Sequence, residues 1–114
     1  MDYSNLSDFE INKLVDVAFH GETTPMRTQS LDFGITNYCI NADQAWPIIK
    51  ENMISLCAYK RANPGMKSVS WWEADNFGDH ITRDNNPLRA AMIVYLLLQE
   101  SLNVPANSTG SDIR

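Results

Sequence analysis

The sequence predicts an α+β fold in which three helices pack with a small antiparallel sheet, and three local patterns lead to this prediction. Residues 86–103 form the longest apolar stretch without a helix breaker. Residues 54–59 alternate apolar and polar side chains, as a half-buried strand does. Ser7 and Glu10 have the spacing of a capping box at the start of a helix. We therefore expect helices at both ends of the chain and a sheet between them.

The 86–103 segment is expected to be the central helix of the fold. Asn86 offers a side-chain acceptor at the N-cap, and Pro87 fits the first helical position, where a backbone N–H has no helical partner. The run from Ala90 to Leu98 is apolar throughout, so it covers every side of a helix and leaves no polar face. Such a helix is either buried in the core or part of an interface. The run is too short to span a bilayer, which needs roughly 20 apolar residues.

Two further helices are predicted before the sheet. The first starts after Ser7 and ends near Gly21. Its expected buried face consists of Ile11, Leu14, Val15, Ala18 and Phe19, and its expected water-facing residues are Asn12, Lys13 and Asp16. The second is capped by Asn41 or Asp43 and runs to about Met53. Pro47 removes a hydrogen bond from that helix at a cost of ~3 kcal/mol, so the helix either begins late, near Trp46, or kinks there.

The sheet is predicted around one hairpin, at about residues 54–73. Leu56 and Ala58 share one face of its first strand and Cys57 and Tyr59 the other, while residues 67–73 form the second strand. Residues 26–31 and 35–40 are weaker strand candidates, because this segment is rich in threonine and aromatic side chains. Residues 74–85 are polar and are interpreted as a loop.

Length, charge and cysteine content limit the class of protein. The chain has 114 residues, and we expect one compact domain over residues 1–103 followed by a flexible tail at residues 104–114. The formal charge of −5 disfavours non-specific nucleic-acid binding, which depends on lysine and arginine. Cys39 and Cys57 are expected to be free thiols in a reducing cytoplasm. The acidic N-terminal segment is not typical of a signal or transit peptide, and no membrane association is expected.

The sequence offers only weak candidates for a metal or catalytic site. Residues 75–79, with Asp84, contain several oxygen ligands, but Phe77 and His80 stand where a calcium-binding EF-hand needs a ligand and a glycine. The cysteines and histidines lack the close spacing of zinc ligands. A pairing of either cysteine with His80 and Asp79 has no nucleophile signature to support it. We therefore expect no cofactor and no enzymatic activity.

Three stretches of the chain together resemble one known family. They are MDYSNLSDFEINK at residues 1–13, ADQAWPII at residues 42–49, and NPLRAAMIVYLLLQE at residues 86–100. In combination they resemble the NinX family of small proteins encoded by lambdoid bacteriophages and prophages. The resemblance implies a phage protein of unassigned function, made in the cytoplasm of an enterobacterial host. It assigns no catalytic residue.

Two surfaces are the candidates for binding. Trp71 and Trp72 point to opposite faces of a regular strand, so we expect one of them near the surface unless a second layer covers it. The candidate contact residues are Trp72, Glu73, Asp75, Asp79 and Asp84. If the N-terminal helices leave one side of the central helix uncovered, Met92, Leu96 and Gln99 would form a self-association surface and a homodimer would follow.

The leading functional hypothesis is a non-enzymatic phage accessory protein that binds a host or phage protein. In its most specific form the protein inhibits a nucleic-acid-processing or defence enzyme, and the acidic loop imitates phosphate charge against a basic groove. The alternative is a single-strand nucleic-acid-binding protein that uses an exposed tryptophan as a stacking platform, although the net charge makes a nucleic-acid partner the weaker hypothesis. A small metal-dependent enzyme is the third.

Overall fold

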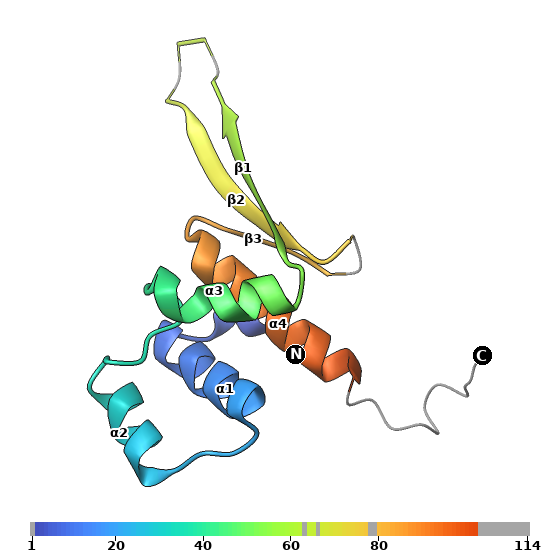
Figure 1. Cartoon of the computed structure of the whole chain (residues 1–114). Coiled ribbons are helices and arrows are strands. Elements are labelled where there is room, and N and C mark those ends of the chain that lie inside the picture. Colours follow the sequence, from blue (N-terminus) through green and yellow to red (C-terminus); the bar gives the residue numbers. More distant parts are fainter. Residues whose placement is uncertain (1, 63, 66, 78–79, 103–114) are drawn as a thin grey trace, which may run out of the picture.

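A computed structural model describes residues 2–62, 64–65, 67–77 and 80–102 (Figure 1). Among these residues the structure has four α-helices and three strands in one antiparallel sheet. In chain order they are α1 (Asp8–His20), α2 (Pro25–Asp32), α3 (Ala42–Glu51), β1 (Ser55–Arg61), β2 (Val69–Asp75), β3 (Ile81–Asp84) and α4 (Pro87–Leu102), after a short 3₁₀ helix at Tyr3–Asn5. The predicted α+β class is confirmed, with one more helix than the predicted three. The predicted tail, residues 104–114, lies outside the described residues.

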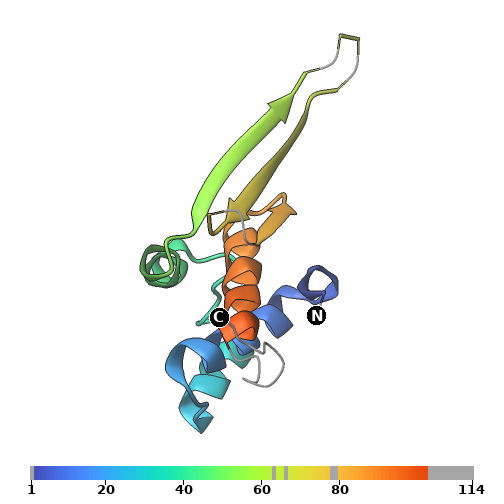
Figure 2. The ribbon, with the colours of Figure 1, turned by 90° about the vertical axis from the view of Figure 1, so that its right-hand side faces the viewer.

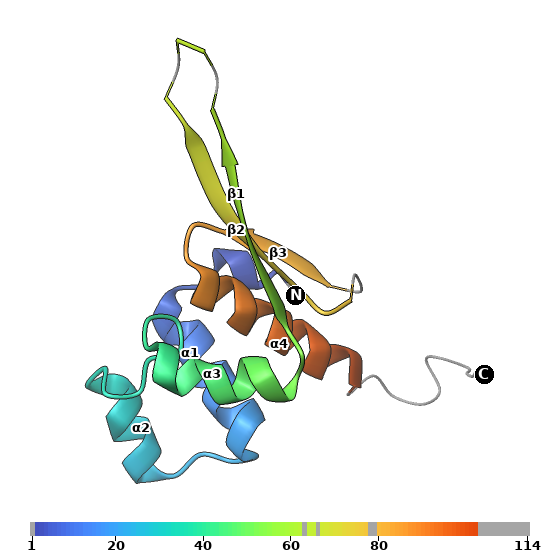
Figure 3. The same ribbon diagram turned by 45° about the horizontal axis from the view of Figure 1, so that its top comes forward.

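Helix α4 is the centre of the fold, as the sequence predicts. All seven residues from Ala90 to Leu96 are buried. Strands β2 and β3 contact one side of α4, and α1 and α3 contact other sides (Figure 3). A helix without a polar face is stable here because protein surrounds its middle turns. Met92 and Leu96 are therefore buried within the chain and Gln99 is only partly exposed. The condition for the predicted self-association surface, an uncovered side of this helix, is not met.

The start of α4 is fixed by Asn86. Its side-chain oxygen accepts hydrogen bonds from the backbone N–H groups of Leu88 and Arg89, at 2.9 and 3.4 Å, which confirms the predicted N-cap. Its side-chain amide donates to the carbonyl of Cys39 at 2.6 Å. One side chain therefore caps the central helix and holds the segment that precedes α3.

Helix α1 has the predicted ends but a different polar face. Ser7 and Glu10 form the reciprocal capping box, and Gly21 ends the helix in the left-handed conformation at φ +85°. Only a residue without a Cβ adopts that conformation without strain. The prediction that Asn12 and Asp16 face water is wrong, because both are buried. The segment 37–39 covers this side of α1, which a single amphipathic pattern does not anticipate.

The two weak strand candidates, 26–31 and 35–40, are not strands. Residues 26–31 lie within α2, where the Thr24 hydroxyl accepts the N–H of Arg27 and Pro25 takes the first helical position. These end signals dominate the weak strand propensity of the segment. Residues 35–40 contain turns, and Tyr38 and Cys39 pack into the core.

Helix α3 accommodates Pro47 in its interior. Asn41 caps the helix at Ala42, so a late start near Trp46 is wrong. Both Pro47 and Asp43, four residues before it, are exposed. The Asp43 carbonyl, which loses its helical donor to the proline, can bond to water instead.

The sheet has the order β1-β2-β3, with antiparallel pairing throughout. Tyr59 lies opposite Trp71 and Ala58 opposite Trp72, which confirms the predicted hairpin and the predicted faces of both strands. The interpretation of residues 74–85 as loop misses β3, which pairs with β2 from Trp72 to Asp75. A four-residue strand with exposed Ile81 and Arg83 has too little apolar pattern to be predicted.

Strands β1 and β2 extend beyond the rest of the protein, as Figures 1 and 2 show. At their base, Leu56 and Ala74 pair with one another and pack in the core. Further along, every residue of β1 from Cys57 to Arg61 is exposed. We call residues 58–72, which include this projecting hairpin, the arm.

Arg89 connects three separate parts of the fold. Its side chain is 14% exposed, and its guanidinium pairs with Asp84 at 3.0 Å and with Asp8 at 2.6 Å. It also donates to the backbone carbonyls of Leu6, at 2.7 Å, and Ser4, at 3.1 Å. The residue therefore joins α4 to the end of β3 and to the N-terminal segment.

We expect Arg89→Ala to lower the free energy of unfolding by about 3 kcal/mol, because it leaves carboxylates and carbonyls without their partner in a partly buried site. The measurement is urea denaturation. Arg83→Ala is the matched control, since the Arg83 side chain is 70% exposed and solvent reaches its ion pair with Glu73 from that side, although the Glu73 side chain is 13% exposed. That control should lose about 1 kcal/mol or less. Equal losses in the two variants would contradict the role of Arg89.

Candidate functional site

The polar loop after β2 uses its side chains to shape the backbone. The Asp75 carboxylate accepts the N–H of Phe77 at 3.1 Å, and the Asn76 side-chain oxygen accepts the N–H of His80 at 2.8 Å. Phe77 adopts φ +61° and is 77% exposed. Within the described ranges, no three His, Cys, Asp or Glu side chains lie together as metal ligands do. These contacts are turn-forming ones.

The predicted acidic surface is divided between the two faces of the sheet. Trp72 lies opposite Asp84, on the face that also carries the core residue Ala74. Glu73 and Asp75 lie on the outer face, because neighbouring residues of a strand alternate. Asp79 lies outside the described residues. The structure therefore does not bring these side chains together on one surface.

Two of the predicted contact carboxylates already have cationic partners. Glu73 accepts a hydrogen bond from Arg83 at 2.7 Å, and Asp84 is paired with Arg89 at 3.0 Å. Asp84 also accepts the N–H of Asn86 at 2.9 Å. The charge of these two groups is thus partly balanced within the chain.

The cysteines and His80 are not arranged as a nucleophile and its base. Cys39 is completely buried, and burial, with Asp8 nearby, raises the pKa of its thiol to about 12. Cys57 is exposed on the outer face of β1. The Nε2 of His80 lies 3.1 Å from the Ser101 hydroxyl, beside the end of α4. A thiol with a raised pKa is a poor nucleophile because little thiolate is present near neutral pH.

The arm carries a stacked aromatic pair on its outer face. The rings of Tyr59 and Trp71 lie nearly parallel, at 9°, with their centres 5.5 Å apart. Tyr59 is 40% exposed and the neighbouring Val69 is 51% exposed. The indole N–H of Trp71 is buried and has no acceptor among the described residues. Trp71 and Trp72 are both partly exposed, so each face of the arm presents one indole ring.

Charge is strongly segregated between the arm and the rest of the chain. The arm contains three of the nine lysines and arginines, namely Lys60, Arg61 and Lys67, and none of the fourteen aspartates and glutamates. All three basic residues are exposed. The protein therefore combines a basic, aromatic projection with an acidic body, a pattern that the sequence interpretation above does not use. The sequence feature that indicates this projection is the absence of aspartate and glutamate from residues 58–72.

The family is decided by a match over almost the whole chain. The family model described as "Bacteriophage P22, NinX" matches residues 2–99. The chain belongs to the NinX family. The resemblance of its three stretches to that family is thereby confirmed, and this NinX protein is a phage accessory protein. No curated protein and no solved structure matches the chain. In the described part of the NinX chain, no helix has the length and hydropathy needed to cross a membrane.

Among the residues that the structure of this NinX protein describes, the least exposed charged residue is Asp16, at 1%. Its side chain accepts a hydrogen bond from the Tyr38 hydroxyl at 2.8 Å. His20 and Arg27 lie 3.6 and 3.5 Å from its two carboxylate oxygens. Burial and this hydrogen bond raise the pKa of Tyr38. The cluster holds α1, α2 and the segment before α3 together, and we assign it a structural role.

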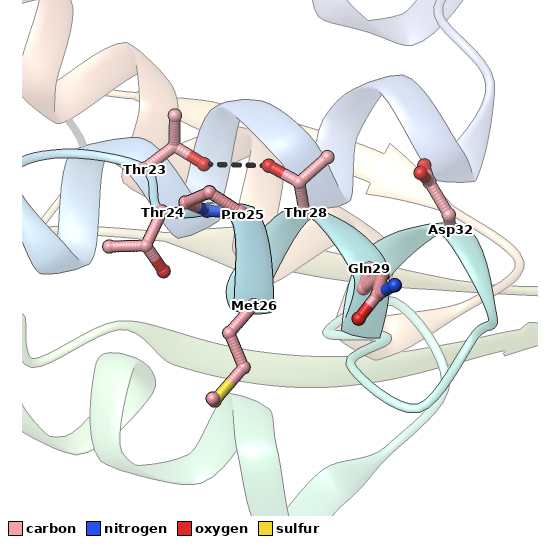
Figure 4. A pocket seen from close by; sticks show the side chains of 7 residues that line it. All are labelled: Thr23, Thr24, Pro25, Met26, Thr28, Gln29 and Asp32. Atoms are coloured by element: carbon pink, nitrogen blue, oxygen red, sulfur yellow. Dashed lines mark hydrogen bonds between the residues drawn. The ribbon is translucent and has the colours of Figure 1, made fainter.

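A shallow hollow lies along α2, lined by residues 23–26, 28, 29 and 32 (Figure 4). The hydroxyls of Thr23 and Thr28 face one another at 3.1 Å, and Met26 points away from them. Of the described residues that line it, Asp32 alone is ionisable. The threonine hydroxyls have no base hydrogen-bonded to them among the residues drawn in Figure 4, and one carboxylate does not by itself form a catalytic arrangement.

We expect the stability of this NinX protein to fall as the pH rises from about 9 to about 12. The folded chain raises the pKa of Cys39 from 9.0 to about 12, so it keeps a proton that the unfolded chain releases in this range. Urea denaturation at pH 8 and pH 10.5, with reducing agent, measures the loss. Cys39→Ala should lose less stability between the two pH values than the parent does. Cys57→Ala, at an exposed thiol, is the control, and identical losses in all three proteins would contradict the prediction.

Proposed function

We propose that this phage accessory protein is a non-enzymatic binding protein whose arm contacts a host or phage protein. The observation that carries the proposal is the arm itself, a two-stranded projection with exposed residues on both faces and with β1 at the edge of the sheet that the structure describes. We place the binding in the cytoplasm of the bacterial host, where phage genes are translated.

A protein partner is favoured because the arm offers backbone as well as side chains. The free edge of β1 can add a strand from another polypeptide through main-chain hydrogen bonds. Tyr59, Trp71 and Arg61 are of the residue types that contribute most to protein interfaces. The basic charge of the arm favours a partner surface that is acidic.

The inhibitor hypothesis has weaker support. In that version Glu73, Asp75, Asp79 and Asp84, beside Trp72, imitate phosphates against a basic groove. The net charge of −5 is in its favour. The ion pairs of Glu73 and Asp84, and the division of the set between two faces, count against it.

A single-strand nucleic-acid partner is the second candidate, and one observation favours it. The stacked pair of exposed Tyr59 and partly exposed Trp71 lies near Lys60 and Arg61. Stacking side chains near cations bind unpaired bases and their phosphates. The acidic body opposes this at long range, because fourteen carboxylates repel a polyanion.

Affinity capture from nuclease-treated lysate of infected host cells tests the protein partner. We expect the tagged parent to retain a specific protein that Arg61→Glu loses. Lys13→Glu is the matched control, since it makes the same charge change at an exposed lysine of α1 and should retain the protein. If Asp75→Lys loses the captured protein and Arg61→Glu retains it, the proposal that the arm binds the partner is overturned and the acidic surface is supported instead.

Tryptophan fluorescence titrated with single-stranded oligonucleotides at two salt concentrations tests the second candidate. We expect no quenching. Quenching that weakens with salt and is reduced in Trp71→Phe would overturn the protein-partner proposal in favour of a nucleic acid, because release of counterions from phosphates makes such binding salt-dependent.

A further inference from the structure

We propose that a partner of the arm is a second copy of this chain, which pairs with it antiparallel through β1 around a two-fold axis at Tyr59. The inference rests on the proposed function, because it uses the same arm. It names one partner and one register.

The edge of β1 has the backbone needed for such pairing. Within the described ranges the sheet has the order β1-β2-β3, so β1 has a described neighbour on one side only. Beyond its base the arm is a two-stranded ribbon, which is marginally stable alone, and a third and fourth strand would support it. The exposed residues Cys57–Arg61 are available on each copy. A two-fold axis pairs β1 of one copy with β1 of the other, so the same edge is covered in both copies.

The register follows from the side chains on the outer face. With Tyr59 opposite Tyr59 of the other copy, the observed pairing of Tyr59 with Trp71 extends to a row of four aromatic rings across the two copies. Aromatic pairs directly opposite one another stabilise antiparallel strands. Ala58 of one copy then lies opposite Lys60 of the other, and Cys57 of one copy lies opposite Arg61 of the other.

Charge complementarity also favours a second copy. In an antiparallel pair the basic tip of each arm is directed toward the acidic body of the other copy. Arg61 of one copy lies beside Cys57 of the other, whose neighbour on β2 is Glu73, and Glu73 is also paired with Arg83 of its own copy. Lys60 lies beside Ala58, whose neighbour on β2 is Trp72, so its ammonium can lie over an indole ring. No like charges lie directly opposite one another in this register, although the two Lys60 residues are diagonal neighbours and edge lysines often prevent pairing.

Light scattering coupled to size-exclusion chromatography, over a range of protein concentrations, tests the dimer. We expect a monomer–dimer equilibrium that high salt weakens. Arg61→Glu should raise the dissociation constant about tenfold or more, because the reversal acts twice in a symmetric dimer. Lys13→Glu is the matched control and should leave the constant unchanged. Circular dichroism confirms that both variants fold.

Disulfide cross-linking tests the register in the full-length chain. In a Cys57→Ser background, Tyr59→Cys places two cysteines directly opposite one another, about 5 Å apart between Cα atoms, where a disulfide forms. Ala58→Cys places them diagonally, about 7–8 Å apart, which is too far. We expect oxidised dimers from Tyr59→Cys and not from Ala58→Cys.

Two outcomes would overturn the inference. One is a parent chain that stays monomeric at all concentrations. The other is cross-linking through Ala58→Cys instead of Tyr59→Cys, which would exclude the charge pairing. A monomer that still captures a protein through Arg61 would leave the proposed function standing. A dimer whose capture of other proteins does not depend on Arg61 would support the inferred dimer and contradict the proposed role of the arm in binding other proteins.

Discussion

The fold depends on the polar contacts at the start of α4. Arg89 joins this helix to Asp84 at the end of β3 and to Asp8 at the start of α1. Asn86, three residues earlier, caps the same helix and holds the carbonyl of Cys39. The apolar middle of α4 supplies the burial energy, but it has no directional preference of its own. These two side chains supply directional contacts that join the first turn of α4 to β3, to the N-terminal segment and to the segment before α3.

This concentration of contacts explains why the arm is the exposed part of the molecule. The base of β1 and β2 is held by Leu56 and Ala74, which pack in the core. Beyond that base, nothing in the described structure covers β1. Asp84, a candidate binding residue by sequence, instead belongs to the Arg89 contacts. Binding is therefore best sought on the arm, whose side chains are not needed to hold the body together.

The predictable parts of the fold are those with local causes. The capping box of Ser7 and Glu10, the Asn86 N-cap and the alternation along β1 each depend on neighbouring residues, and all three are confirmed. The position of Asp16 was not predictable, because it depends on Tyr38, which is 22 residues away and donates to it. Strand β3 is likewise formed by its pairing with β2 and not by its own composition.

The candidate site was likewise only partly predictable from local sequence. Sequence proximity suggested that Trp72, Glu73 and Asp75 act together, but strand alternation sends Trp72 to one face and the two carboxylates to the other. The acid-free segment from 58 to 72 was visible in the sequence, but its meaning was not, since a basic loop is usually only solvated. Its projection from an acidic body gives the molecule a strong charge asymmetry (Figure 2). Such asymmetry orients an approaching partner before contact, so a charged arm directs where and how the protein binds as well as how tightly.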